Sequence, residues 1–145
     1  MKILIDADGC PVVNIAVKAA VQHGIECIIL CDTSHEFRRE GADTVTVSKG
    51  ADSVDFALVN LVKKGDIVVT QDYGLAAMCL ARSAFPIHQD GMAYNSDNIG
   101  GLLMQRYIAK KIRNAGGRIK CSPKRKAEQD EAFAITLEAM IKSGI

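Results

Sequence analysis

The sequence predicts an α/β fold in which helices cover both faces of a mainly parallel sheet. Short apolar runs rich in β-branched residues alternate along the chain with longer stretches of helical periodicity. The run Ile67-Val68-Val69 is apolar at consecutive positions, which is typical of parallel strands buried on both faces. The chain has 145 residues, of which 48% are apolar, enough for one sizeable core. We therefore expect residues 1–145 to form one doubly wound domain.

The order of the apolar runs gives the expected strands and the first helix. The first helix should begin at Pro11, whose missing N–H costs nothing in a first turn, and end near Gly24, a natural left-handed cap. Its predicted inward face consists of Val13, Ala16, Val17 and Ala20. The expected strands are residues 2–5, 25–30, 44–47, 66–70 and, more weakly, 85–88.

Four more helices are expected, over about residues 52–64, 74–84, 97–114 and 127–143. Gly65 should close the first of these four, and Gly116-Gly117 should end the third. The last would form a C-terminal helical extension of the domain. The predicted apolar faces are Val54, Leu58, Leu61 and Val62 in the first of the four and Phe133, Leu137, Met140 and Ile141 in the last.

Composition excludes several classes of protein. The longest apolar runs are a few residues, whereas a bilayer-spanning helix needs about 20. The N-terminal run meets Asp6 after three apolar residues, too early for a signal peptide. Five scattered cysteines without a CxxC pair suit a reducing compartment and do not favour a zinc site. We therefore expect a cytoplasmic protein without a membrane segment.

The net charge of +1 conceals two unlike segments. Residues 1–105 contain eight basic and 13 acidic residues, whereas residues 106–126 contain nine basic residues and no acidic one. The remaining residues, 127–145, carry one basic and four acidic residues. The chain is therefore predicted to join an acidic body to a strongly basic stretch.

Acidic residues follow several of the predicted strands. Because right-handed crossovers bring the carboxyl ends of parallel strands to one sheet edge, these acids should meet where α/β proteins bind ligands. Asp6 and Asp8 follow the first strand, Asp52 and Asp55 open the helix after the third, and Asp72 follows the fourth. Asp97 opens a later helix and is a further candidate.

Helix capping is the competing explanation for three of these acids. Helix N-termini lie on the same edge and prefer Asp. Asp55 and Asp97 fit capping better than ligation, and Asp52 fits both equally. Asp6 ends a strand several residues before Pro11, so capping does not account for it; Asp8 precedes Gly9 and can also be a turn residue.

Converging carboxylates repel one another unless they take up protons or a cation. With only oxygen donors at hand, Mg²⁺ or Mn²⁺ fits the predicted cluster better than zinc. One or two such ions can activate water and stabilise the leaving oxygen of a phosphodiester. The pattern therefore favours nuclease chemistry with Asp6, Asp8, Asp52 and Asp72 as catalytic residues.

Two motifs carry a family resemblance: Ile5-Asp6-Ala7-Asp8-Gly9-Cys10-Pro11-Val12 and Thr70-Gln71-Asp72-Tyr73-Gly74-Leu75-Ala76. They resemble the YaiI/YqxD family of uncharacterised bacterial proteins over nearly the whole chain. That family is similar to PIN/NYN-type nucleases, which implies a Rossmann-like three-layer α/β/α domain with a metal-dependent acidic cluster.

The resemblance also assigns roles to residues. Asp6 matches the acid that ends the first PIN strand, and Lys49-Gly50-Ala51-Asp52 is similar to the Lys-Gly-x-Asp turn of the NYN branch. Asp72 matches the acid after the fourth strand. The fourth acid of the PIN set has no clear match, and Asp8, Asp55 and Asp97 are candidates for its place.

The basic stretch predicts contact with phosphate. Arg106, Lys110 and Arg113 recur at i, i+4 and i+7 and so share one helix face. Nine positive charges without a negative one suit a nucleic acid backbone, with RNA the expected partner, although a solvated helix face is the alternative. Lys49 can hold phosphate or simply solvate a turn. The other predicted contacts are Arg118, Lys120, Lys124, Arg125 and Lys126.

Two other functions remain open at this point. An incomplete acid set would leave a nucleic-acid-binding module without catalysis. Asp6-Ala7-Asp8-Gly9 after an apolar strand also resembles the nucleophile motif of haloacid-dehalogenase-type phosphatases, in which Asp6 would be phosphorylated.

Overall fold

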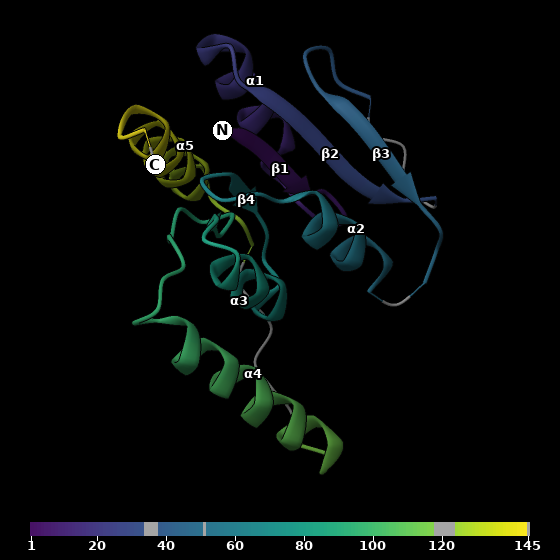
Figure 1. Cartoon of the computed structure of the whole chain (residues 1–145). Coiled ribbons are helices and arrows are strands. Elements are labelled where there is room, and N and C mark those ends of the chain that lie inside the picture. The colour runs from purple at the N-terminus through teal and green to yellow at the C-terminus, as the bar shows by residue number, and fades with distance from the viewer. Residues whose placement is uncertain (34–37, 51, 118–123, 145) are drawn as a thin grey trace.

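The computed structural model describes residues 1–33, 38–50, 52–117 and 124–144 (Figure 1). Within these residues, five parallel strands form one sheet in the order β3-β2-β1-β4-β5. The predicted parallel sheet is therefore confirmed. The strands are β1 (Lys2–Asp6), β2 (Glu26–Asp32), β3 (Asp43–Val47), β4 (Ile67–Val69) and β5 (Phe85–Ile87).

Helices cover both faces of the sheet, which gives the predicted three layers. The contacts place α1 and α5 together on one face and α2 and α3 on the other. The helices are α1 (Val13–His23), α2 (Ser53–Leu61), α3 (Tyr73–Ala81), α4 (Ile99–Asn114) and α5 (Ala127–Lys142).

Successive residues of β1 supply the two halves of the core. Ile3 and Ile5 pack with α1 and with Phe133 and Leu137 of α5. Leu4, between them, packs on the opposite face with Leu58 of α2 and with α3. This alternation follows from the period of two in a strand, and it explains why the run is apolar at every position.

Several element boundaries differ from those expected. Pro11 and Val12 form a turn, and α1 begins two residues after Pro11; it ends as predicted at Gly24, with φ of 64°. The helix expected to reach residue 64 ends at Leu61, because Val62 is extended and the Asp66 carboxylate accepts hydrogen bonds from the backbone N–H groups of Lys63 (2.8 Å) and Lys2 (3.1 Å). These hydrogen bonds fix the segment between Leu61 and β4 in a non-helical conformation, so the helix does not continue.

Helix α4 is set apart from the rest of the fold. None of its residues is buried, and its contacts run mainly to α3 (Figure 1). It carries Arg106, Lys110 and Arg113, so most of the described basic stretch lies on an element that projects from the sheet. In the part of the chain that the structure describes, no helix combines the length and apolarity needed to cross a membrane.

Candidate acidic site at the sheet edge

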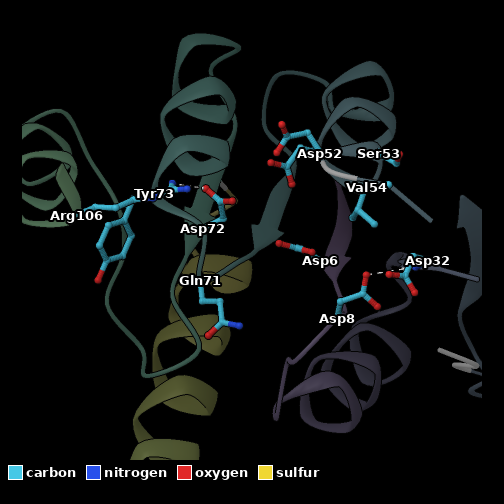
Figure 2. A pocket seen from close by; sticks show the side chains of 12 residues that line it. Asp6, Asp8, Asp32, Asp52, Ser53, Val54, Gln71, Asp72, Tyr73 and Arg106 are labelled. Atoms are coloured by element: carbon cyan, nitrogen blue, oxygen red, sulfur yellow. Dashed lines mark hydrogen bonds and ion pairs between the residues drawn. The ribbon is translucent and has the colours of Figure 1, made fainter. Parts of the chain in front are cut away.

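A cavity of about 470 Å³ opens at the carboxyl ends of β1 and β2, beside the N-termini of α2 and α3. Its lining is dominated by carboxylates that come from well-separated parts of the chain (Figure 2). The predicted gathering of acids at this edge is therefore present in the structure. The six carboxylates are those of Asp6, Asp8, Asp32, Asp52, Asp55 and Asp72.

Asp6 ends β1 and points into the cavity between Asp72 and Asp8 (Figure 2). Its Oδ2 accepts a hydrogen bond of 2.9 Å from the Thr70 hydroxyl. Burial raises the pKa of Asp6 from 3.8 to about 6, and the Thr70 hydrogen bond lowers it only in part, while nearby carboxylates raise it further. Asp6 is therefore a carboxyl group held where its charge is costly, as is typical of functional sites.

Thr70 connects Asp6 to the neighbouring chain segments. Its hydroxyl donates to Asp6 and accepts from the backbone N–H of Asp72 at 3.0 Å. Its carbonyl oxygen accepts from the Tyr94 hydroxyl at 3.1 Å. Sequence reasoning missed this role, for which the only signal was a polar residue directly after the apolar run Ile67–Val69. Thr70 thus fixes the spacing between Asp6 and the loop that carries Asp72.

The Tyr94 hydroxyl is expected to contribute measurably to this support. Tyr94→Phe removes its bond to a buried carbonyl and should lower the free energy of unfolding by about 1 kcal/mol. Tyr107→Phe, which alters an exposed ring on α4, should change it by less than about 0.5 kcal/mol. Urea unfolding of both variants checks this difference, and equal stabilities would contradict the role assigned to Tyr94.

Asp72 is the N-cap of α3 and faces a basic side chain. Its Oδ1 accepts from the Leu75 backbone N–H and from Arg106 Nη1, each at 3.1 Å. Arg106 reaches it from α4 and also lines the cavity. Asp72 therefore caps a helix, a role that the sequence analysis considered only for Asp52, Asp55 and Asp97.

Asp52 and Asp55 come from the start of α2. Asp52 occupies the N-cap position of the helix in a left-handed conformation with φ of 65°, but its side chain makes no capping hydrogen bond. The capping alternative therefore holds for the position of Asp52 and not for a side-chain bond. Asp55 lies in the first turn. Burial, followed by the charges of Asp72 and Asp52, raises the pKa of Asp55 to about 6, and Arg106 opposes this shift. Asp55 therefore lies in the electrostatic field of both Asp72 and Asp52.

Asp8 and Asp32 lie on the β2 side of the cavity. The Asp8 carboxylate accepts from the backbone N–H of Asp32 at 3.2 Å, and Gly9, with φ of 72°, allows the turn that follows. Asp32 was missed by sequence reasoning. It ends β2, one strand from Asp6, so the rule that located Asp6 also applied to it.

Asp97 lies elsewhere, which corrects its place among the candidate ligands. Its backbone N–H donates to the Asn95 side chain at 2.9 Å within an exposed turn before α4, and it does not line the cavity. Asn98, one residue later, is the N-cap of α4, so Asp97 does not cap that helix either. The asparagine-bonded turn displaces the helix start that the sequence placed at residue 97.

The basic residues fall into three groups. Arg106 forms the first group, because it lines the acidic cavity. The second group is exposed, either on α4 or on loops and at a helix start, and consists of Lys110, Arg113, Lys49, Lys124 and Lys126. Arg125 is different, because it bonds Asp90 at 2.6 Å, Asp130 at 2.8 Å and the Gln89 carbonyl at 2.8 Å. The prediction that Arg125 contacts nucleic acid is therefore corrected to a structural role. Arg118 and Lys120 lie outside the described residues.

The donor set fits a hard divalent cation bound mostly through water. Among the described residues, no three His, Cys, Asp or Glu side chains converge closely enough to hold an ion by themselves. Mg²⁺ commonly keeps several waters and uses only one or two carboxylates. Burial, with added repulsion from neighbouring carboxylates, raises the pKa values of Asp6 and Asp55, and a bound cation would offset this cost of charge. The described cysteines, Cys10, Cys27, Cys31 and Cys79, do not line the cavity.

Comparison with known proteins places the chain in a family. The family model described as "Uncharacterized BCR, YaiI/YqxD family" matches residues 4–143 of this chain. The chain belongs to this family. A UPF0178 protein from Exiguobacterium sibiricum is 50% identical over 133 residues, covering 92% of this chain and 91% of the relative. A UPF0178 protein from Clostridium acetobutylicum is 47% identical over 146 residues and covers 99% of each chain.

Among the solved structures, a variant of Rae1 (YacP) from Bacillus subtilis is similar to this chain. It is 14% identical with a TM-score of 0.44 over the full length of both chains, a similarity that carries no argument about this YaiI/YqxD protein. The names of the UPF0178 relatives state no activity.

Proposed function

We propose that this YaiI/YqxD-family protein is a metal-dependent nuclease that hydrolyses phosphodiester bonds in RNA. The observation that carries the proposal is the cavity at the sheet edge, where six carboxylates and Arg106 gather from five elements and their loops. Open α/β sheets bind their ligands at this edge. The resemblance of the Asp6 and Asp72 motifs to PIN/NYN-type nucleases supports the same assignment.

Asp6, Asp52 and Asp72 are the proposed holders of Mg²⁺ or Mn²⁺, with Asp8 and Asp55 beside them. A bound divalent ion would supply an activated water and charge stabilisation for the leaving oxygen. Asp6 is positioned for this by Thr70, and Asp72 by its cap on α3. Burial and neighbouring acids make the negative charge of Asp6 and Asp55 costly, and a bound cation would offset that cost.

The positive face of α4 is the proposed contact for the nucleic acid backbone. Arg106 lies at the cavity, and Lys110 and Arg113 continue one and two turns further along the helix. An acidic cavity repels a polyanion unless a separate positive surface holds it. Binding through such a surface releases counterions, so RNA affinity should fall steeply with salt.

Cleavage of a short RNA by the purified protein tests the proposal. We expect cleavage with Mn²⁺, none with EDTA, and a rate at least about tenfold lower for Asp72→Asn, since asparagine retains the cap but removes the charge. Asp97→Asn is the matched control, because Asp97 lies in an exposed turn outside the cavity. Equal cleavage by wild type and Asp72→Asn would contradict the proposal.

A second function is favoured by one observation, namely that no three of the described acidic, histidine or cysteine side chains converge on a single ion position. In this alternative the protein binds RNA without cleaving it. Retained, salt-dependent RNA binding without turnover across Mg²⁺, Mn²⁺ and other divalent ions would favour it over the nuclease. RNA binding independent of salt would contradict both functions.

A further inference from the structure

Arg106 differs from the other basic residues of α4 because its guanidinium forms an ion pair with a carboxylate of the acidic cavity. Its Nη1 lies 3.1 Å from Asp72 Oδ1, and it lowers the pKa of Asp55 against burial and the neighbouring acids, which raise it. Lys110 and Arg113 share its helix face, but no ion pair is found for either among the described residues. Arg106 thus connects α4, the proposed contact for the RNA backbone, to Asp72, a proposed metal ligand.

Local geometry leaves room for this contact. Gly74, in the first turn of α3, lies beneath the ion pair: a methyl group placed there would be 3.3 Å from Asp72 Oδ1 and 3.4 Å from Arg106 Nη1. The guanidinium therefore passes over a residue without a side chain to reach Asp72. Its own side chain remains 56% exposed, so it can leave the carboxylate without disturbing a packed core.

We propose that Arg106 is an internal cation that occupies Asp72 until a divalent metal ion takes its place, and that the released guanidinium then binds the phosphate of the RNA. This inference rests on the proposed function and adds regulation to the same site. A carboxylate shared by a guanidinium and a metal ion gives part of its charge to each, so the two cations compete. The freed Arg106 lies on the same face as Lys110 and Arg113, which are the proposed backbone contacts.

The exchange makes metal and RNA binding cooperative. Metal binding releases a phosphate ligand, and phosphate binding removes the competitor of the metal. By linkage, each ligand must increase the affinity of the other by the same factor. Without Arg106, metal binding should be tighter and its coupling to RNA weaker.

Calorimetric titration with Mn²⁺ in the absence of RNA tests the competition. Arg106→Gln should bind Mn²⁺ about three- to fivefold more tightly than wild type, because an exposed ion pair is lost. Lys110→Gln removes the same charge one turn along the same face and should change the affinity less than about twofold, since screening weakens distant exposed charges. Equal effects of the two substitutions would overturn the inference while leaving metal binding intact. Failure of Mn²⁺ to bind any of the three proteins would instead contradict the proposed function and the competition with it.

RNA binding provides the second measurement. With a 2′-O-methyl RNA that resists cleavage, Arg106→Gln should weaken binding several-fold in Mn²⁺ but less than about twofold in EDTA, where wild-type Arg106 is held by Asp72. If Arg106 acted only through its charge, or only on the shape of α4, Arg106→Gln would reduce RNA affinity by the same factor in Mn²⁺ and in EDTA. That result would overturn the inference.

Discussion

Asp6→Asn is expected to stabilise the metal-free protein at pH 7.5 by on the order of 2–3 kcal/mol while lowering RNA cleavage at least about 100-fold. The stabilisation follows from the pKa of Asp6, which is about 6 in the folded protein against an ordinary 3.8. Folding therefore makes ionisation of this carboxyl costly at neutral pH. Asparagine removes the charge but still offers an oxygen to the Thr70 hydroxyl.

The stabilisation should depend on pH in a definite direction. Between about pH 4 and pH 6 the folded state holds the Asp6 proton more tightly than the unfolded chain does, so the wild-type protein loses stability as pH rises through this window. Asp6→Asn lacks this loss. The difference in unfolding free energy between the two proteins should therefore grow from pH 4 to about pH 6.5 and then stay constant.

Urea unfolding in EDTA across this pH range measures the effect. Asp97→Asn is the control, since its carboxylate is exposed and outside the cavity, and its pH profile should run parallel to that of the wild type. Mn²⁺ added at pH 7.5 should stabilise wild type more than Asp6→Asn, because a ligand of the native state adds stability by mass action. Parallel pH profiles for wild type and Asp6→Asn would contradict the prediction that folding makes ionisation of Asp6 costly.

The fold and the main acids were predictable because both follow from the order of elements. Consecutive apolar residues in β1 and β4 require a sheet covered on both faces, and parallel strands then bring Asp6 and Asp72 to one edge. Asp52 joined them because α2 also begins on that edge. None of this required knowledge of side-chain contacts.

Most of the remaining features depend on side-chain contacts that a sequence does not display, and Asp32 is the exception. Asp97 was misplaced because the Asn95 side-chain oxygen accepts hydrogen bonds from the backbone N–H groups of Asp97 and Asn98, which forms a turn where a helix start was expected. Asp32 was missed although its position at the end of β2 gave the same signal as Asp6. The pairing of Arg106 with Asp72 joins residues 34 positions apart through the packing of α4 on α3, which no local pattern reports.

The assignment of Arg125 is the other point at which charge pattern and structure differ. The sequence grouped it with its neighbours because the stretch is uniformly basic. The structure shows that its guanidinium joins the loop after β5 to the start of α5, through Asp90, Asp130 and the Gln89 carbonyl. Gly91 in that loop lies so close to α5 that a methyl group there would be 2.6 Å from the Ala132 carbonyl oxygen. Arg125 therefore acts as a clamp between two segments in close contact.

Arg125→Met is expected to lower the free energy of unfolding by about 2 kcal/mol, because it removes three charge-assisted hydrogen bonds from a side chain that is only 22% exposed. RNA affinity should stay within about twofold of wild type, since three donors of this guanidinium are already bonded within the protein.

Lys124→Met is the matched control, one residue away and exposed. It should change the unfolding free energy by less than about 0.5 kcal/mol. Because Lys124 belongs to the basic stretch predicted to contact the RNA backbone, its loss should lower the number of counterions released on RNA binding by about one. Urea unfolding and a salt titration of RNA affinity distinguish the two residues. If Arg125→Met loses RNA affinity but not stability, Arg125 contacts the RNA as its charge alone predicted. If Arg125→Met loses stability but not RNA affinity, and Lys124→Met does the reverse, neighbouring residues of one basic stretch serve folding and binding separately.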